Sequence, residues 1–547
     1  MFKVILNDKT IELENKTKVV DLIENHNYSY IACTVDNRLR ELNYELKEDC
    51  TVKLLGLEEE ECMRIYESSL RYLFSMAVSR LYPELKIKFN YHISRSLFCK
   101  ILNPNIKFNQ EMVDKIEVEM RNIIKKDIPL KRMVVDREEA QRVYEHYDLK
   151  DKIDILEYRP EHTVHLYSCD GYVNYMYSYM VPSTGYLSSF VLRLYTPGII
   201  MQYPRSEAGG NMIPFEDEHT YGVTLKKANA WAKTIKSETI AEINSHLDTL
   251  PHIVDFVNMC ETKHNNDLKV LGDKICEDIA NVKLIAIAGP SSSGKTTFSN
   301  RLRIELMTRG IQPVKISIDD YYVDRDKLIR DENGKYDFEH LNAIDIELFD
   351  KHLVSLINGE EVQMPSFDFT KGKRVPGKTV KLPPNTPIII EGIHALNEKL
   401  TPSIPRGNKF LIYIAPQIQT NLDNQNPISI TQFRLIRRIV RDNSFRAFDA
   451  ERTLEIWDSV RKGEFKWIYD NQEGVDFVFN SELDYELCVL KKHALPLLKA
   501  IPVNSPDYIT ANHLVKFLKY FIDIDDSLVP CNSLLREFIG GSCFQDV

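Results

Sequence analysis

One eight-residue segment constrains the fold of this chain more than any other. Residues 289–296 are Gly-Pro-Ser-Ser-Ser-Gly-Lys-Thr; they follow the apolar run 284–288 and precede a helical pattern over 297–307. A glycine-rich loop between a buried strand and a helix binds phosphate, because small residues let backbone N–H groups close around phosphate oxygens and the helix N-terminus adds a positive dipole. Lys295 is expected to reach the outer phosphates, and the Thr296 hydroxyl to ligate Mg²⁺. The residues predicted to bind the nucleotide are Gly289, Ser291, Ser292, Ser293, Gly294, Lys295, Thr296 and Thr297.

Two carboxylates stand at the ends of further predicted strands. The apolar run 315–318 is followed by Asp319, and the run 387–390 is followed by Glu391. Apolar strands that alternate with helices indicate a parallel sheet buried on both faces, and ligands bind at the carboxyl edge of such a sheet. Asp319 is expected to accept the proton of an acceptor hydroxyl, and Glu391 to hold Mg²⁺ or its water opposite Thr296. The alternative for Asp319 is an acidic loop in water.

Arginines recur at helical spacing further along the chain. Arg434, Arg437, Arg438 and Arg441 are spaced i, i+3, i+4 and i+7, and Arg446 lies just beyond. The four share one helical face, where like charges repel unless an anion lies between them. We expect that anion to be a nucleotide triphosphate gripped by a closing lid, because arginine offers a bidentate fork to phosphate. Arg438, Arg441 and Arg446 are the predicted catalytic arginines; a solvated basic stripe and an RNA contact are the alternatives.

These blocks, in this order, resemble the uridine kinase branch of the phosphoribulokinase/uridine kinase family over roughly residues 281–500. The family's D-x-[FY]-Y motif matches Asp319 and Tyr322, its E-G motif matches residues 391–392, and its R-R-x-x-R-D motif matches residues 437–442. The segment 337–342 is similar to the family's D-F-[DE]-H-P-D. The resemblance implies a P-loop kinase domain that uses ATP and Mg²⁺, with Asp319 as the catalytic base.

The stretch expected to bind the acceptor departs from that family. Uridine kinases carry the motif P-x-Y-D-F-x-x-H in the stretch that aligns with residues 365–372. In this chain Phe367 stands in place of the motif's tyrosine and Gly372 in place of its histidine. Ile456 stands in place of a glutamine of the family. These three side chains neither donate nor accept hydrogen bonds, so we expect weak discrimination among nucleosides. Arg374 could contact a polar or anionic group of the acceptor. The residues predicted to bind the acceptor are Asp319, Tyr322, Phe367 and Arg374.

The N-terminal half carries a separate resemblance. Residues 1–56 have the pattern of a small α+β unit and resemble the TGS domain, and residues 68–185 resemble the second, editing domain of threonyl-tRNA synthetases. The editing domain's H-x-x-x-H and C-x-x-x-H positions fall on Ser68, Tyr72, Met176 and Met180, which include neither His nor Cys. We therefore expect this half neither to bind zinc nor to hydrolyse mischarged tRNA. The full arrangement is similar to the TGS-containing nucleoside kinases of bacteria.

The charge and the cysteine content of the chain argue against several classes of protein. Lys and Arg total 70 against 80 for Asp and Glu, and the net charge of −10 argues against a general nucleic-acid-binding surface. Ten cysteines without a C-x-x-C pair indicate reduced thiols of the cytosol. No run approaches the roughly 18 apolar residues of a membrane span, and the first residues do not resemble a signal peptide. We expect a cytoplasmic protein without membrane or nucleic-acid partners. The sequence does not decide whether the chain forms a homo-oligomer.

The sequence thus predicts a multidomain α/β chain. A TGS-like β-grasp domain (1–56), an α+β region like the synthetase's second domain (57–222) and a helical connector (223–280) precede a P-loop kinase domain with a parallel sheet and a C-terminal extension (281–547). The predicted function is transfer of the γ-phosphoryl group of ATP to a small-molecule hydroxyl, with the 5′-hydroxyl of a nucleoside as the favoured acceptor. A kinase of another alcohol, such as a sugar phosphate, and a nucleotide-switched, RNA-associated regulator are the alternatives.

Overall fold

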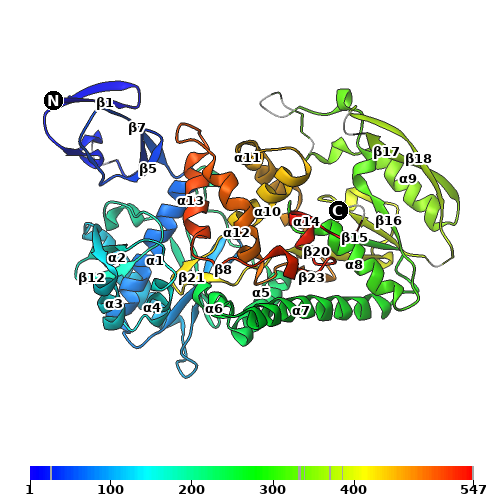
Figure 1. The fold of residues 1–547 in the computed structure, drawn as a ribbon, viewed down its shortest axis with the longest axis horizontal. Coiled ribbons are helices and arrows are strands. Elements are labelled where there is room, and N and C mark those ends of the chain that lie inside the picture. Colours follow the sequence, from blue (N-terminus) through cyan, green and yellow to red (C-terminus); the bar gives the residue numbers. More distant parts are fainter. Residues whose placement is uncertain are drawn as a thin grey trace.

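The computed structural model describes residues 1–24, 27–330, 334, 336–337, 339–368, 371–384 and 386–544. A mixed sheet formed by the first residues lies at one end of the molecule, and a parallel sheet from the C-terminal part lies toward the other (Figure 1). The predicted multidomain α/β fold is confirmed.

The first 56 residues form a five-stranded mixed sheet. Its elements are β1 (Phe2–Leu6), β2 (Lys9–Leu13), β4 (Tyr30–Val35), β5 (Arg38–Glu41) and β7 (Cys50–Gly56), with a 3₁₀ turn at Val19–Leu22 and a small pair of β3 (Thr17–Lys18) and β6 (Glu45–Leu46). The strand order is β2-β1-β7-β4-β5, with β1 and β7 parallel. Asn7 (φ 44°) and Asp8 (φ 68°) form the tight turn between β1 and β2, since Asn and Asp tolerate a left-handed backbone.

A long helix, α1 (Glu60–Leu81), follows this sheet. Glu60 and Glu61 lie in its first turn, where they suit the positive end of the helix dipole, and both accept hydrogen bonds from Arg64. The helix is buried along most of its length because its apolar side chains belong to one core that contains residues of the first sheet, such as Val4, and of the next region, such as Phe89.

Two antiparallel sheets and three helices make up the region after α1. The elements are β8 (Ile87–Ile93), β9 (Ser96–Ile101), α2 (Gln110–Lys125), β10 (Lys131–Asp136), α3 (Arg137–His146), α4 (Lys150–Leu156), β11 (Thr163–Cys169), β12 (Tyr172–Tyr175), β13 (Val191–Tyr195) and β14 (Gly198–Gln202). The strand orders are β13-β14-β9-β8 and β10-β11-β12.

Three helices, α5 (His219–Ile235), α6 (Ile240–Ser245) and α7 (Leu250–Cys276), connect this region to the parallel sheet. From their sequence, residues 224–280 are expected to be helical throughout with only Pro251 interrupting, and this expectation is wrong. Pro251 stands in the first turn of α7, where its missing N–H is no loss, and the helix breaks lie before Thr239 and before Thr249. Thr239 caps α6, and Lys236, with φ 55°, ends α5. The predicted start of the connector at residue 223 falls inside α5, which begins at His219.

A five-stranded parallel sheet organises the C-terminal part, as predicted. Its strands are β15 (Leu284–Ala288), β16 (Val314–Ser317), β19 (Ile388–Glu391), β20 (Lys409–Ala415) and β23 (Phe477–Asn480), in the order β16-β19-β15-β20-β23. Ile285 and Ile287 belong to the core on the side of α7, whereas Leu284 and Ala286 belong to a second core that contains side chains of α5. The central strand is therefore buried on both faces, which explains its uninterrupted apolar run.

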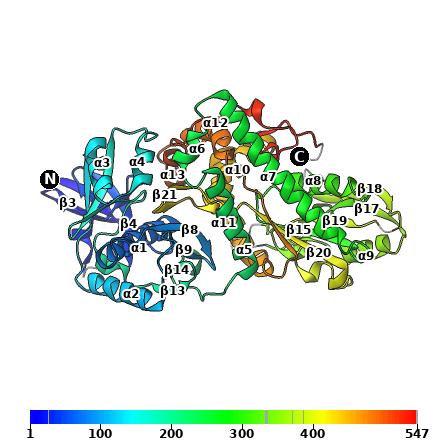
Figure 2. The same cartoon turned by 90° about the horizontal axis from the view of Figure 1, so that it is seen from below.

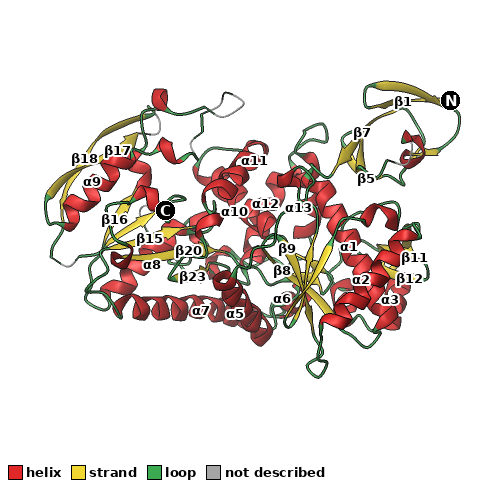
Figure 3. Cartoon of the chain, turned by 180° about the vertical axis from the view of Figure 1, so that it is seen from behind, coloured by secondary structure: helices red, strands yellow, loops and turns green. Residues whose placement is uncertain are grey.

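The remaining C-terminal elements surround this sheet. They are α8 (Lys295–Met307), α9 (Ile346–Ile357), the hairpin β17 (Glu361–Asp368) and β18 (Lys373–Lys381), the hairpin β21 (Asn421–Asp423) and β22 (Asn426–Pro427), α10 (Ile430–Phe445), α11 (Ala450–Trp467), α12 (Glu486–Lys499), α13 (Tyr508–Leu518) and α14 (Arg536–Ile539). Seen from below, α7 runs alongside α8 (Figure 2). From behind, the β17–β18 hairpin and α9 lie at the outer edge of the molecule (Figure 3).

Two further observations concern expectations from composition. None of the helices in the described part of the chain combines the length and apolar character needed to cross a bilayer. The ten cysteines are free thiols, and Cys531 and Cys543 are exposed.

Candidate functional site

The predicted phosphate-binding loop connects β15 to α8, as expected. A Cβ at Gly289 would lie 2.0 Å from the carbonyl oxygen of Ile414 in the neighbouring strand β20, so only glycine fits where the loop leaves the sheet. Gly294 has φ 89° and stands immediately before α8, a conformation that residues with a side chain rarely adopt. These two glycines bring the loop to the N-terminus of α8, where backbone N–H groups without helical partners point outward.

Lys295 lies folded over this loop. Its Nζ donates to the carbonyl oxygens of Gly289, at 2.9 Å, and Pro290, at 3.1 Å. Burial lowers the pKa of Lys295, against the carboxylates of Glu391 and Glu537, which raise it. A buried ammonium held at the loop is suited to neutralising phosphate charge.

Thr296 and Glu391 meet as the sequence predicts. Thr296 Oγ1 donates to Glu391 Oε1 at 3.2 Å, because β15 and β19 are parallel neighbours and Ile287 is in register with Glu391. Burial raises the pKa of Glu391, while the positive charges of Lys315 and Lys295 oppose that rise. A hydroxyl and a carboxylate are oxygen ligands that Mg²⁺ prefers, and Mg²⁺ takes further ligands from water and substrate phosphates. Among the described residues, no group of three or more His, Cys, Asp or Glu is arranged to hold a metal ion.

Asp319 reaches the same edge of the sheet from β16. It lies in a one-turn 3₁₀ helix, Ile318–Tyr321, directly after the strand, and Ser317 at the end of β16 is in register with Glu391. Burial raises the pKa of Asp319, whereas Lys295 and Arg446 lower it. A carboxylate with a raised pKa at this edge of the sheet can take up a proton from a hydroxyl.

The predicted acceptor-binding residues are only partly grouped. The rings of Tyr322 and Phe367 lie 5.6 Å apart, and Phe367 N donates to Asp320 Oδ1 at 3.2 Å. Arg374 instead forms an ion pair of 2.8 Å with Asp345, so its charge is directed at a carboxylate of the chain. Three residues of the motifs quoted for this region, Phe338, Phe369 and Thr370, lie outside the described residues.

The arginine face of α10 differs from the prediction at two positions. Arg434 and Arg437 are buried, and each is paired with a carboxylate: Arg434 with Glu464 of α11, and Arg437 with Glu486 of α12 at 2.6 Å. Arg434 Nε also donates to the carbonyl oxygen of Ser291 at 3.0 Å. The prediction that only a bound anion can separate the four arginines is therefore wrong, because carboxylates of the chain itself compensate them.

Arg438, Arg441 and Arg446 gather around one buried carboxylate, Asp442. The ion-pair distances are 3.1 Å, 2.8 Å and 3.6 Å respectively. Arg438 Nη1 also donates to Ser291 Oγ at 2.6 Å, which ties the helix to the phosphate-binding loop. Three guanidinium groups therefore share the Asp442 carboxylate near the C-terminal end of α10.

Three glutamates of this region are not among the residues that the sequence predicts for the site. Glu464 Oε1 accepts a hydrogen bond from Ser291 N at 2.9 Å, and Glu537 Oε2 accepts one from Thr297 N at 2.9 Å. Glu339 has its pKa raised to about 7 by burial, against the nearby charge of Arg438. The segment containing Glu339 resembles a family motif, but Glu464 and Glu537 reach the loop from more than 160 residues away, which no local pattern reveals.

The positions matched to the synthetase editing site lie in a packed interior. Ser68, Met176 and Met180 are buried, and Tyr72 Oη donates to the carbonyl oxygens of Tyr167, at 3.2 Å, and Tyr172, at 2.8 Å.

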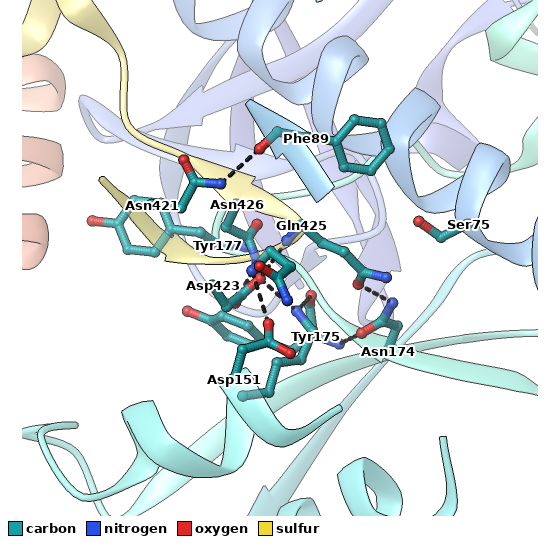
Figure 4. Close-up of polar contacts among 12 residues, drawn as sticks. Ser75, Phe89, Asp151, Asn174, Tyr175, Tyr177, Asn421, Asp423, Gln425 and Asn426 are labelled. Carbon is teal, nitrogen blue, oxygen red and sulfur yellow. Dashed lines mark hydrogen bonds and ion pairs between the residues drawn. The ribbon is translucent and has the colours of Figure 1, made fainter. Parts of the chain in front are cut away.

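The β21–β22 hairpin packs against the segment that contains Asn174 and Tyr177 (Figure 4). Asn174 Nδ2 donates to Gln425 Oε1 at 2.6 Å, and Tyr177 N donates to Asn426 Oδ1 at 3.0 Å. A segment between β20 and β23 of the parallel sheet therefore contacts residues on either side of Met176.

Comparisons with known proteins give the two parts of the chain separate relatives. Residues 284–483 match the model of the phosphoribulokinase / uridine kinase family, which supports a small-molecule kinase in this part. The threonine–tRNA ligase of Clostridium kluyveri is 29% identical over 252 residues, which are 45% of this chain and 38% of the ligase. That of Fusobacterium nucleatum is 31% identical over 218 residues, which are 40% of this chain and 34% of the ligase.

Among solved structures, a possible uridine kinase from Bacillus stearothermophilus is 22% identical, with a TM-score of 0.24, and the match covers 39% of this chain and 100% of that one. The chain spans less than half the length of the curated ligases it matches. The ligase similarity supports a TGS- and editing-like N-terminal region.

Proposed function

We propose that this protein is an ATP- and Mg²⁺-dependent kinase that phosphorylates the hydroxyl of a small molecule, with the 5′-hydroxyl of a nucleoside as the favoured acceptor. The observation that carries the proposal is the meeting of four predicted residues at one edge of the parallel sheet: Lys295, Thr296, Asp319 and Glu391. The family match over residues 284–483 supports the same reaction class.

The roles follow from chemistry and position. Backbone N–H groups of residues 289–297 and the Lys295 ammonium bind the phosphates, while Arg438, Arg441 and Arg446 supply further positive charge as the γ-phosphoryl group transfers. Asp319 accepts the proton of the acceptor hydroxyl while the oxygen of that hydroxyl bonds to the γ-phosphorus. The bond between the γ-phosphorus and the β-phosphate oxygen breaks, which releases ADP. Mg²⁺, held by Thr296 and Glu391, would neutralise phosphate charge when bound.

We propose the domain limits that the sequence predicts: residues 1–56, 57–222 and 223–280, followed by the kinase domain from residue 281. The N-terminal half is proposed to have lost the editing chemistry of the synthetases, since Ser68, Tyr72, Met176 and Met180 supply no His or Cys. We propose a cytoplasmic location on the basis of the ten free thiols.

A kinase of another alcohol is the second candidate, and one observation favours it. Phe367 and Gly372 lack the hydrogen-bonding groups that uridine kinases use, so a nucleobase would meet little polar recognition there.

The test uses the purified full chain with Mg-ATP and a panel of nucleosides, sugars and sugar phosphates. The readouts are ADP release and, by mass spectrometry, a phosphorylated product. A nucleoside product supports the favoured acceptor; a product from another alcohol supports the second candidate. ATP binding without transfer to any acceptor would favour a nucleotide-switched regulator.

A further inference from the structure

The C-terminal tail segment, defined here as residues 532–542, packs against the phosphate-binding loop. Glu537 Oε2 accepts a hydrogen bond from Thr297 N at 2.9 Å. Leu534 covers the start of α8, because a Cβ at Gly294 would lie 2.4 Å from Leu534 Cδ2. The reaction proposed above uses neither contact.

Packing fixes the tail segment in this place. Leu534 and Phe538, on either side of Glu537, are 1% and 0% exposed. Arg536 anchors the backbone from the other side: its Nη2 donates to the carbonyl oxygens of Asp526, at 2.8 Å, and Val529, at 2.6 Å. Glu537 is therefore held at the loop by a buried, hydrogen-bonded segment rather than by a mobile side chain alone.

Thr297 N belongs to the first turn of α8, whose N–H groups have no partner inside the helix. In a phosphate-binding loop these groups cradle the α- and β-phosphates, and the helix dipole favours an anion there. The Glu537 carboxylate is such an anion. It lies close enough to Lys295 and Glu391 to raise the pKa of each.

We propose that Glu537 occupies the position of a nucleotide phosphate oxygen at Thr297 N, and that the tail segment is an intramolecular competitor of the nucleotide. The inference rests on the nucleotide binding proposed above. One N–H group cannot donate a full hydrogen bond to both anions, and a carboxylate beside a phosphate adds like-charge repulsion. Nucleotide binding must therefore release Glu537 from the loop.

The first test compares the affinity for Mg-ATP of the full-length wild type, Glu537→Ala and Glu537→Gln by calorimetry. Loss of a competing charge-assisted hydrogen bond of about 1.5–3 kcal/mol corresponds to roughly ten- to hundredfold tighter binding, with the larger gain for Glu537→Ala because glutamine keeps an acceptor oxygen. Asp526→Asn is the matched control: it removes a carboxylate next to the tail segment that pairs with Lys492 and His493 rather than with the loop. The control should bind ATP as the wild type does.

Equal or weaker ATP binding by Glu537→Ala, with measurable binding by the wild type, overturns the inference and leaves the proposed function standing. Absence of binding of ATP, GTP and inorganic triphosphate by the wild type and Glu537→Ala overturns both. Hydrogen exchange of the wild type gives a measurement that needs no variant. Saturating Mg-ATP should speed amide exchange in residues 534–540, and slower or unchanged exchange there contradicts the competition.

Discussion

Lys152 Nζ lies 2.9 Å from Asp423 Oδ1, and both side chains are fully buried. Lys152 belongs to α4 of the N-terminal half and Asp423 to β21, which lies between β20 and β23 of the parallel sheet in the chain, so the ion pair joins the two parts of the chain. Asn426 Nδ2 donates to both Asp423 oxygens, at 2.9 and 2.8 Å (Figure 4). Lys152 also donates to the carbonyl oxygen of Tyr175 at 3.1 Å. A buried pair is tolerated when its hydrogen bonds are satisfied in this way.

Lys152→Met should therefore destabilise the protein strongly, because it leaves the Asp423 carboxylate buried without a cation. We expect a loss of about 3–5 kcal/mol in the free energy of unfolding, measured by urea denaturation. The control is Lys150→Met on the same helix, whose pair with Asp154 is largely exposed and whose loss should cost at most about 1 kcal/mol. Similar losses for the two variants would contradict the structural role of the buried pair.

The sequence predicts those parts of the fold that local pattern determines. The apolar run of β15 and the glycine-rich loop each carry their own periodicity or turn chemistry, and each forms as expected. Local pattern does not predict β5 (Arg38–Glu41), because its charged sequence has no apolar alternation and its strand conformation depends on pairing with β4. The breaks between α5, α6 and α7 likewise depend on caps such as Thr239 rather than on a proline.

The site shows the same division. Lys295, Thr296, Asp319 and Glu391 come together because strand order in a parallel sheet brings the ends of neighbouring strands to one edge. The partners of Arg434 and Arg437 could not be predicted, because helical spacing shows which side chains share a face but not which distant carboxylates meet them.

Asp319→Asn should leave ATP binding intact and reduce kcat by roughly 10²–10⁴-fold, the usual loss for a general base. The matched control is Asp320→Asn, whose carboxylate accepts hydrogen bonds from Phe367 N and Ser366 Oγ instead. Steady-state kinetics with the acceptor found in the panel provides the measurement. Turnover of Asp319→Asn within a few-fold of the wild type would remove this residue from the mechanism.

Lys295→Ala should weaken ATP binding and abolish transfer together. The ammonium is buried at the loop, and the same point charge stabilises the bound phosphates and the transferring group. Calorimetry of ATP binding, paired with single-turnover transfer, checks both effects. Unchanged ATP affinity would contradict the assignment of residues 289–296 as the nucleotide site.

Glu339 should make stability depend on pH near neutrality. Burial raises the pKa of its carboxyl to about 7 in the folded protein, whereas an unfolded glutamate titrates near ~4.3. The folded state therefore holds a proton that the unfolded state has lost, so this contribution to stability is complete below about pH 4.3 and is lost as the pH rises through 7. Between pH 5 and pH 8, the melting temperature of the wild type should fall relative to that of Glu339→Gln. Glu347→Gln, an exposed change on α9, is the control, and a difference between wild type and Glu339→Gln that stays constant with pH would contradict the shift.

Selectivity for the acceptor should be weak among nucleosides, or should favour an acceptor other than uridine. Phe367 packs against Tyr322, and its side chain has no polar atom. Gly372 has no side chain, and Arg374 forms an ion pair with Asp345. An apolar pocket discriminates by only about 10–200-fold, whereas a site that hydrogen-bonds a base edge reaches about 10⁴-fold because the wrong ligand leaves buried polar groups unpaired. The measurement is the ratio of kcat/KM for uridine to that for adenosine, guanosine and ribose compounds. A preference for uridine above about 10³-fold exceeds what these side chains can provide, and would mean that another segment recognises the base.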